Sequence, residues 1–152
     1  MDKVTFMTNF SDFDLKDFTP YLLNLAAEAS SLGFQKHYKE KYGMLRTEWR
    51  VVFHLGQYGP MHAKEICNRA RIHKTKVSRA VAALEKKRFL KREQESDDRR
   101  HEKLSLTRPG MVAFRDLLVA AQRFDDALVE EFSQHQRDIL RKCLTRIARL
   151  TD

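Results

Sequence analysis

Two consecutive amphipathic helices are encoded by residues 63–87, AKEICNRARIHKTKVSRAVAALEKK. Apolar side chains spaced three and four residues apart predict a short first helix with one buried face: Ala63, Ile66, Cys67 and Ala70. Arg71-Ile72-His73 predicts a turn, after which a second helix runs from Lys74 to about Lys87 with its own apolar stripe: Val77, Ala80, Val81 and Leu84. Ile72 stands just before the second helix and can pack on Val77 as a hydrophobic staple. The stretch therefore predicts a helix-turn-helix.

The face of the second helix opposite the apolar stripe is basic and carries hydroxyl groups. At 100° per residue, Thr75, Arg79 and Lys86 fall on this face. An arginine can fork onto a guanine edge, and hydroxyl groups can bond to bases or phosphates, so such a helix suits the major groove of double-stranded DNA. The lysines suit phosphates. The candidate DNA contacts of this helix are Lys74, Thr75, Lys76, Ser78, Arg79 and Lys86. A solvated basic face is the alternative interpretation.

The flanking sequence predicts two helices before this stretch, and a hairpin and two helices after it. Thr19-Pro20 starts a helix that runs to about Lys39, and Thr47 can cap a second helix. Alternation around residues 90–94 and 103–106 predicts a β-hairpin with a charged tip at 96–101. Thr107 can cap a long helix to about Phe132, and Ser133 with Gln136 forms a capping box for the last one. The predicted fold class is mainly α with a small β-hairpin wing: a winged helix-turn-helix plus a helical dimerisation region.

The positive charge of the chain is concentrated in its middle third. The 152 residues carry a net charge of +8, and residues 64–108 hold fifteen Lys or Arg against seven Asp or Glu, so the whole surplus falls there. Residues 1–63 and 109–152 each hold equal numbers of both signs. A surplus confined in this way is typical of a module that displaces counterions from phosphates. The middle third is therefore expected to meet nucleic acid.

Several other functional classes find no support in the sequence. The apolar runs are much shorter than the roughly 20 residues that a membrane span needs, and the first residues do not resemble a secretory signal. We therefore expect a cytoplasmic protein with no membrane partner. Neither the two cysteines nor the six histidines show metal-ligand spacing, and no phosphate loop, nucleophile elbow or catalytic carboxylate pair is present. We expect no metal, no cofactor and no enzymatic activity.

Two motifs give the chain a family resemblance. The helix-turn-helix run and the sequence Asp98-Arg99-Arg100, followed by Leu106-Thr107-Arg108-Pro109-Gly110, resemble the MarR family of bacterial transcriptional regulators over about residues 20–150. The resemblance implies a homodimeric repressor on a pseudo-palindromic operator, commonly released by a small aromatic or phenolic acid. It also implies that Arg100 enters the minor groove with Asp98 as its partner, and that Arg99 and Arg92 contact phosphates.

Two residues depart from the family pattern. Arg88 occupies a position where the family usually has glycine, so the chain could leave the second helix by another route, because a left-handed arginine costs about 1 kcal/mol. His73 stands where Asp or Ser is common, and we expect it to cap the helix poorly.

Dimerisation has independent support in the helices outside the middle third. The first, fifth and sixth predicted helices have more apolar surface than a small winged module can cover, which leaves a patch for a second copy. Packing of these helices on one another within one chain is the alternative. The predicted organisation is an N-terminal extension (1–18), a helical dimerisation region (19–44 and 109–152) and a winged helix-turn-helix DNA-binding domain (45–108).

A candidate effector pocket lies near the junction of the first two helices. An aromatic wall with one cation suits an aromatic carboxylate. The candidate ligand-binding residues are Phe34, His37, Tyr38, Tyr42, Arg46 and Trp49. Aromatic residues at such a junction are also typical of an ordinary core.

Two other functions are compatible with a basic helix-turn-helix. One is an architectural protein that binds duplex DNA with little regard to sequence. The other is a regulator that senses oxidants through Cys67 or Cys143, although a thiol on an apolar helix face usually behaves as a small hydrophobe.

Overall fold

The computed structural model describes residues 12–95, 97 and 101–150. The chain forms two compact units, divided between Gly33 and Phe34. No helix in the described residues is both long and apolar enough to cross a membrane.

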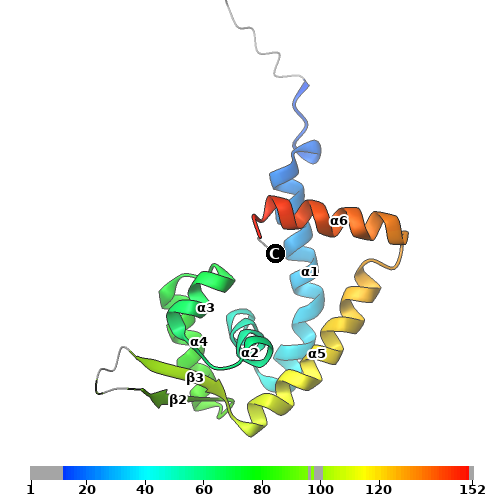
Figure 1. The fold of residues 1–152 in the computed structure, drawn as a ribbon. Helices are drawn as coiled ribbons and strands as arrows, with labels where there is room; N and C mark the ends of the chain where they lie inside the picture. The colour runs from blue at the N-terminus through cyan, green and yellow to red at the C-terminus, as the bar shows by residue number, and fades with distance from the viewer. Residues whose placement is uncertain (1–11, 96, 98–100, 151–152) are drawn as a thin grey trace, which may run out of the picture. The chain divides into compact units, whose positions relative to one another are not determined.

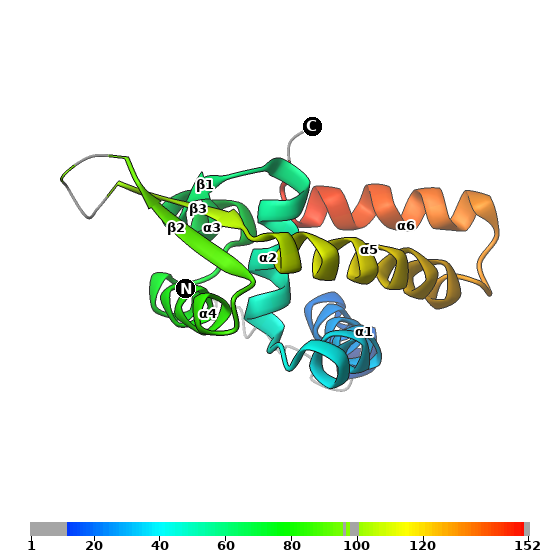
Figure 2. The ribbon, with the colours of Figure 1, turned by 90° about the horizontal axis from the view of Figure 1, so that it is seen from below.

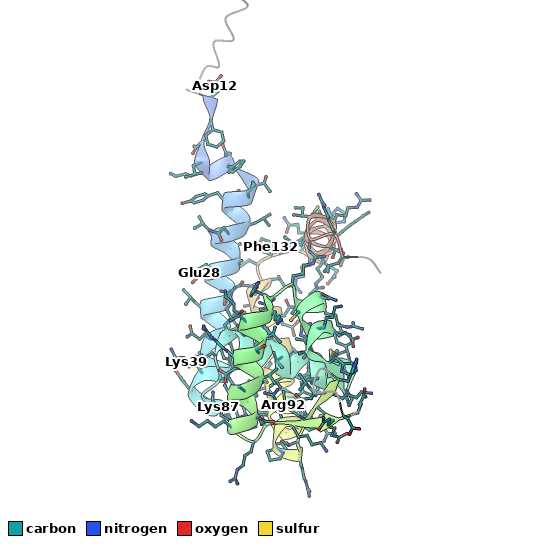
Figure 3. All side chains as sticks on the ribbon, turned by 90° about the vertical axis from the view of Figure 1, so that its left-hand side faces the viewer. Asp12, Glu28, Lys39, Lys87, Arg92 and Phe132 are labelled. Carbon is teal, nitrogen blue, oxygen red and sulfur yellow. The ribbon has the colours of Figure 1, made fainter. Side chains whose placement is uncertain are left out.

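The first unit contains a short 3₁₀ helix, η2 (Leu15–Asp17), and the beginning of helix α1 (Thr19–Tyr42). The carboxylate of Asp14 caps η2 by accepting a hydrogen bond from the Lys16 N–H at 2.9 Å. Figure 3 labels Asp12 and Glu28 in this part of the chain. Six of its large apolar side chains are exposed: Phe13, Leu15, Phe18, Leu22, Leu25 and Leu32.

The second unit is a winged helix-turn-helix followed by two further helices (Figures 1 and 2). Its elements after α1 are α2 (Arg46–Tyr58), β1 (Met61–His62), α3 (Ala63–Ala70), α4 (Lys74–Lys86), β2 (Leu90–Gln94), β3 (Glu102–Leu106), α5 (Arg108–Leu128) and α6 (Gln134–Ile147). The predicted fold class, mainly α with a small β wing, is confirmed. The predicted hairpin is β2–β3, and it projects from the helices in both views.

The sheet contains one strand that the sequence pattern does not predict. The strand order is β1-β3-β2, all antiparallel, with Met61 opposite Leu104 on one side and Arg92 opposite Leu104 on the other. β1 has only two residues, which is too short for an alternating pattern to reveal. It ties the start of α3 to the wing.

The core of the second unit is built from the predicted apolar stripes. The inward positions of α2, α3 and α4 are buried: Val51, Val52, Leu55, Ile66, Ala70, Val77, Ala80, Val81 and Leu84. Leu90 and Leu104 of the sheet and Ala113 and Leu117 of α5 join the same cluster. The buried faces leave the opposite side of α4 exposed.

The helix ends mostly follow the predicted caps, with three differences. Thr107 Oγ1 accepts from the Gly110 N–H, and Ser133 and Gln136 form the reciprocal capping box, as predicted. Thr47, however, does not cap α2: the cap residue is Leu45, so the helix begins two residues earlier, at Arg46, and the carboxylate of Glu48 accepts from the Leu45 N–H at 2.5 Å. α1 extends to Tyr42, and the long helix ends at Leu128 instead of about Phe132.

The exit from α4 keeps the left-handed geometry that the family resemblance implies. Arg88 has φ = 66°, and the Phe89 N–H donates to the Leu84 carbonyl at 2.9 Å, so the alternative exit is not taken. Thr107 Oγ1 donates to the Arg88 carbonyl at 2.6 Å, which holds the turn against the start of α5. A Cβ on Gly110 would lie 2.0 Å from the Phe89 carbonyl oxygen. Only glycine fits there.

Two polar clusters join α1 and the loop after it to later helices. The buried carboxylate of Glu48 accepts from Lys87 Nζ at 2.7 Å, and the same ammonium donates to the Gly43 carbonyl at 2.6 Å. These bonds connect the start of α2 to the end of α4.

In the second cluster, Asp116 of α5 accepts from Lys41 Nζ at 2.7 Å and from the Tyr42 hydroxyl at 2.5 Å. The hydrogen bonds from Lys41 and Tyr42 lower the pKa of the Asp116 carboxyl. Burial, followed by the bond to Asp116, raises the pKa of the Tyr42 hydroxyl.

Candidate nucleic-acid interface

The turn between α3 and α4 positions α4, the second helix of the helix-turn-helix, which is called the recognition helix below. Arg71 adopts a left-handed conformation, φ = 53°, and the Ile72 N–H donates to the Cys67 carbonyl at 3.2 Å. Ile72 is buried, as the staple prediction requires. His73 Nδ1 accepts from the Thr75 N–H at 3.2 Å. The expectation that His73 is a poor cap was therefore wrong, because an imidazole nitrogen supplies the acceptor that Asp or Ser usually provides.

The outer face of α4 carries donors that bond to no other described residue. The six predicted contact residues are all exposed: Lys74, Thr75, Lys76, Ser78, Arg79 and Lys86. The side chains of Lys74, Lys76, Ser78, Arg79 and Lys86 form no hydrogen bond or ion pair with any described residue. Figure 3 looks onto this side, with Lys87 and Arg92 labelled near the C-terminal end of α4. A row of exposed cations and hydroxyls that have no partner among the described residues is suited to bind a polyanion.

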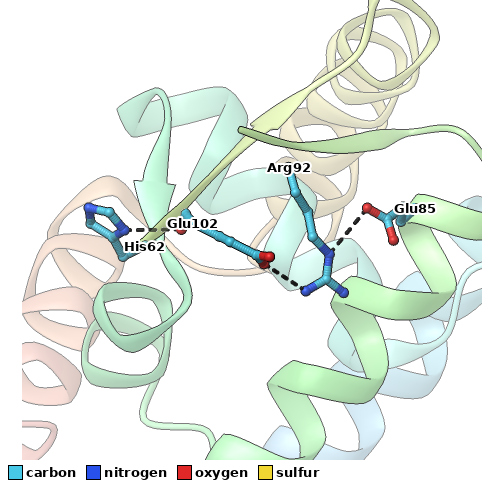
Figure 4. Close-up of polar contacts among 4 residues, drawn as sticks. All are labelled: His62, Glu85, Arg92 and Glu102. Carbon is cyan, nitrogen blue, oxygen red and sulfur yellow. Dashed lines mark hydrogen bonds and ion pairs between the residues drawn. The ribbon is translucent and has the colours of Figure 1, made fainter. Parts of the chain in front are cut away.

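Arg92 braces the wing against α4. Its Nε donates to Glu85 of α4 at 3.1 Å, and its Nη1 donates to Glu102 of β3 at 3.1 Å (Figure 4). His62 Nδ1 lies 3.0 Å from the Glu102 carbonyl oxygen, which links β1 to the same strand. The phosphate contact predicted for Arg92 stays a prediction, since the guanidinium already bonds to two carboxylates in the free protein.

A hollow of about 200 Å³ separates the recognition helix from the wing. Ser78 and Arg92 both line it, together with Lys64 and His62. The structure thus brings a residue of the predicted recognition face close to a residue of the wing. The wing-tip residues Asp98, Arg99 and Arg100 lie outside the described residues.

Four of the six predicted effector residues form a packed aromatic cluster. The ring centroids of Phe34 and Trp49 are 5.2 Å apart, those of Tyr38 and Trp49 are 5.7 Å apart, and those of Phe34 and His37 are 5.5 Å apart. Phe34 and Tyr38 are buried, and burial raises the pKa of the Tyr38 hydroxyl. The aromatic rings fill the junction with one another.

The other two predicted effector residues also contact groups outside this cluster, although the charge of Arg46 still reaches Tyr38. Tyr42 packs on Phe89, with centroids 6.0 Å apart, and bonds to Asp116. Arg46 lines a different cavity, near the turn between α3 and α4. The cavity that does border the cluster is about 370 Å³ and is lined by Lys36, His37, Arg123 and Phe124, among others.

Three charged residues form tertiary contacts that the sequence analysis did not predict. The carboxylate of Glu48 is only 2% exposed and pairs with Lys87. Arg50 Nη2 donates to the Ala70 carbonyl at 2.9 Å, and both terminal nitrogens of Arg71 donate to carbonyls at the end of α6. In the sequence, Glu48 and Arg50 could have been recognised only as charged residues next to the apolar positions of α2.

The cysteines and the possible metal ligands form no evident site. Cys67 is half-buried and Cys143 is exposed, so Cys143 lies on the open side of α6 and not in a core. Within the described residues, no three His, Cys, Asp or Glu side chains are grouped closely enough to hold a metal ion.

Comparison with known proteins identifies similar regulators. The profile of the MarR family matches residues 42–101. The uncharacterized HTH-type transcriptional regulator YwoH of Bacillus subtilis is 25% identical over 99 residues, which are 65% of this chain and 72% of YwoH. A MarR/EmrR family transcriptional regulator from Acinetobacter sp. ADP1 superposes with a TM-score of 0.80 at 25% identity, over 90% of this chain and 96% of that one. Bordetella bronchiseptica BpsR shares the fold, with a TM-score of 0.81 at 16% identity over 92% of this chain and 99% of that one.

Proposed function

We propose that the chain is a MarR-family transcriptional regulator, and that it acts as a homodimeric repressor that binds a pseudo-palindromic DNA operator. Members of this family are regulators and not enzymes. The observation that carries the proposal is the outer face of α4, where exposed donors have no partner within the described residues. The proposed DNA-binding domain spans residues 45–108.

Each residue of this surface has a role that follows from its chemistry. Arg79 forks onto a guanine edge, while Thr75 and Ser78 bond to bases or phosphates. Lys74, Lys76 and Lys86 hold the phosphate backbone. At the wing, Arg100 enters the minor groove with Asp98 orienting it, and Arg99 contacts a phosphate. Arg92 keeps the wing close to α4 and can exchange one of its carboxylates for a phosphate.

The dimer is supported by apolar side chains that a single copy leaves exposed. In α6 and just after it, one face of the helix is uncovered: Ile139, Leu140, Leu144, Ile147 and Leu150, each between 38% and 56% exposed. In α1, Leu22, Leu25 and Leu32 are also exposed. A second copy that covers such faces removes a large apolar patch from water. Two-fold symmetry then presents two recognition helices about 34 Å apart, one DNA turn.

The proposed effector is a small aromatic carboxylate that releases the operator. The cavity bordered by His37 and Phe124 offers an apolar wall and the cations Lys36 and Arg123, and its volume of about 370 Å³ suits a small organic molecule. DNA binding by BpsR, which shares this fold, is regulated by 6-hydroxynicotinic acid. An effector acts only if it binds two spacings of the recognition helices with different affinities. A protein with this function works beside the chromosome, in the cytoplasm.

Footprinting on the DNA upstream of the protein's own gene tests the proposal, followed by competition gel shifts. A specific regulator prefers its operator over random duplex by roughly 10³-fold or more. An architectural DNA-binding protein shows no such preference, and that result would refute a sequence-specific repressor. Phenolic and aromatic acids are then screened for release of the footprinted DNA.

Two substitutions in α4 test the assignment of the recognition face. Arg79→Ala is expected to cost about 1 to 3 kcal/mol and to relax preference at one or two base pairs. Lys86→Ala is expected to weaken binding to all sequences alike. Arg115→Ala, an exposed cation on α5 outside the surface, serves as the matched control. If the Arg79 and Lys86 variants lose affinity in the same sequence-independent way, the proposed groove face is wrong.

A further inference from the structure

A second positively charged site lies beside the N-terminal end of the recognition helix, α4. A cavity of about 240 Å³ opens between the start of α2, the turn that joins α3 to α4, and the first turn of α4. Its lining includes five basic side chains and no carboxylate: Arg46, Arg50, Arg71, His73 and Lys76. These residues come from three separate elements, so the cavity joins the body of the second unit to the recognition helix.

The bonds that the guanidinium groups of Arg50 and Arg71 form with described residues go to backbone carbonyls. Arg50 donates to the Ala70 carbonyl at 2.9 Å. Arg71 donates from Nη1 to the Ala148 carbonyl and from Nη2 to the Arg149 carbonyl. The ammonium of Lys76 bonds to none of the described residues. Carbonyl oxygens satisfy the donors of the two guanidinium groups but do not cancel their positive charge.

Gathering these cations in one cavity is electrostatically unfavourable. Burial lowers the pKa of the Arg50 guanidinium, and the positive charge of Arg46 lowers it further. Arginine stays protonated at neutral pH in spite of such shifts. Repulsion between like charges in a partly buried cavity is offset when an anion enters it.

We propose that this cavity binds a phosphate-sized oxyanion, held by Arg50, Arg71 and Lys76. Guanidinium groups match the oxygen atoms of such an anion in pairs, and the lysine adds a mobile point charge. The oxyanion can be a backbone phosphate of the bound DNA or a free phosphate, and the first source rests on the proposed function. Since Arg71 also bonds to the end of α6, the anion joins α2, α6 and the recognition helix.

The first arm of the test uses inorganic phosphate alone. The purified full-length protein is titrated with phosphate in a calorimeter and in thermal melts, with chloride adjusted so that the ionic strength stays constant. We expect phosphate to raise the Tm, and its affinity to fall at least tenfold in the double variant Arg50→Gln, Arg71→Gln. Lys76→Gln, which removes no intramolecular bond to a described residue, keeps the test valid if the double variant does not fold. Arg115→Gln is the control and is expected to bind phosphate like the parent protein.

The second arm uses a random-sequence duplex and measures how affinity depends on salt. Loss of one phosphate contact reduces the slope of log affinity against log salt by about 0.9. We expect this reduction in Arg50→Gln if the DNA backbone supplies the anion, and an unchanged slope if the anion is free phosphate.

The outcomes separate the two sources and the two proposals. Phosphate binding that the variants abolish, with an unchanged salt slope, identifies a free anion, and it does so even if the protein has no operator. A reduced slope without phosphate binding identifies the DNA backbone. If all variants still bind phosphate, or if neither arm shows any change, the proposed anion site is wrong. The proposed function is tested separately, and a footprint by the parent protein would still support it.

Discussion

The ion pair between Glu48 and Lys87 is expected to respond very differently to the loss of its two partners. Glu48 is 2% exposed, and its carboxylate has two donors, the Leu45 N–H at 2.5 Å and Lys87 Nζ at 2.7 Å. The Lys87 side chain is 34% exposed, and its ammonium also bonds to the Gly43 carbonyl. The lysine can therefore turn to water when its partner is removed, whereas the glutamate cannot.

The magnitudes follow from this asymmetry. Lys87→Met leaves a buried carboxylate with a single N–H donor, and stranding a buried charge costs about 3 to 5 kcal/mol. Glu48→Gln keeps an oxygen acceptor for the Leu45 N–H and leaves an ammonium that water can solvate. Its cost is the charge-assisted part of two hydrogen bonds, about 1 to 2 kcal/mol. We therefore expect Lys87→Met to be the more destabilising change, by about 2 kcal/mol.

Urea unfolding followed by far-ultraviolet circular dichroism measures both free energies. The protein concentration is held constant, because the stability of a dimer depends on it. Glu65→Gln is the control, since Glu65 is exposed and pairs with Arg69 on the surface of α3, where such a pair contributes about 0 to 1 kcal/mol. If Glu48→Gln costs as much as Lys87→Met, burial of the carboxylate does not decide the energy of this pair, and the reasoning is refuted.

Three further changes test local features of the fold. Gly110→Ala places a Cβ 2.0 Å from a backbone oxygen, so we expect a loss of at least about 2 kcal/mol in urea unfolding. Arg88→Gly removes a left-handed arginine, φ = 66°, and is expected to add about 1 kcal/mol. The pKa of the Asp116 carboxyl is lowered, first by its bond to Lys41 and then by Tyr42, so this carboxylate contributes stability above the pKa of its unfolded form. That contribution is lost as the pH falls below about 4, and Asp116→Asn should flatten this acid limb of the stability curve.

Each of these changes has a control within the chain. Val112→Ala alters an exposed position near Gly110 and is expected to change stability little. A second left-handed residue, Arg149, lies at the end of α6, and Arg149→Gly reports the same gain away from the wing. Asp138→Asn leaves the Asp116 cluster intact and should preserve the acid limb. A tolerated Gly110→Ala, a loss on Arg88→Gly, or an unchanged acid limb in Asp116→Asn would contradict the respective explanation.

The helix-turn-helix and its exposed face were predictable because both depend on local sequence. Apolar residues at helical spacing in residues 63–87 decide which sides of α3 and α4 are buried, and burial of Val77 and Leu84 leaves Thr75 and Arg79 in solvent. Thr107 and Ser133 were predictable caps for the same reason, since a cap is settled within four residues. The wing followed from alternation around residues 90–94 and 103–106.

The candidate effector residues could be predicted only in part. Phe34, Tyr38 and Trp49 do meet at the junction of the first two helices, but they fill the space themselves. Sequence spacing shows that aromatic residues are close together, but not whether a cavity remains between them. Arg46 was assigned to this group by its position in the chain; its charge does reach Tyr38, and it also lines a cavity beside the turn between α3 and α4.

By itself, the sequence determined the order of the helices, the buried side of each one and the segment that holds the positive surplus. The tertiary structure alone decided which charges are paired. Glu48 pairs with Lys87, and Arg92 pairs with Glu85 and Glu102, whereas Arg50 and Arg71, which line one cavity, donate to backbone carbonyls. The physical reason is the sequence distance over which each feature is decided. The apolar face of a helix depends on residues a few positions apart, whereas the partner of a charged side chain belongs to another element that comes close only when the chain folds.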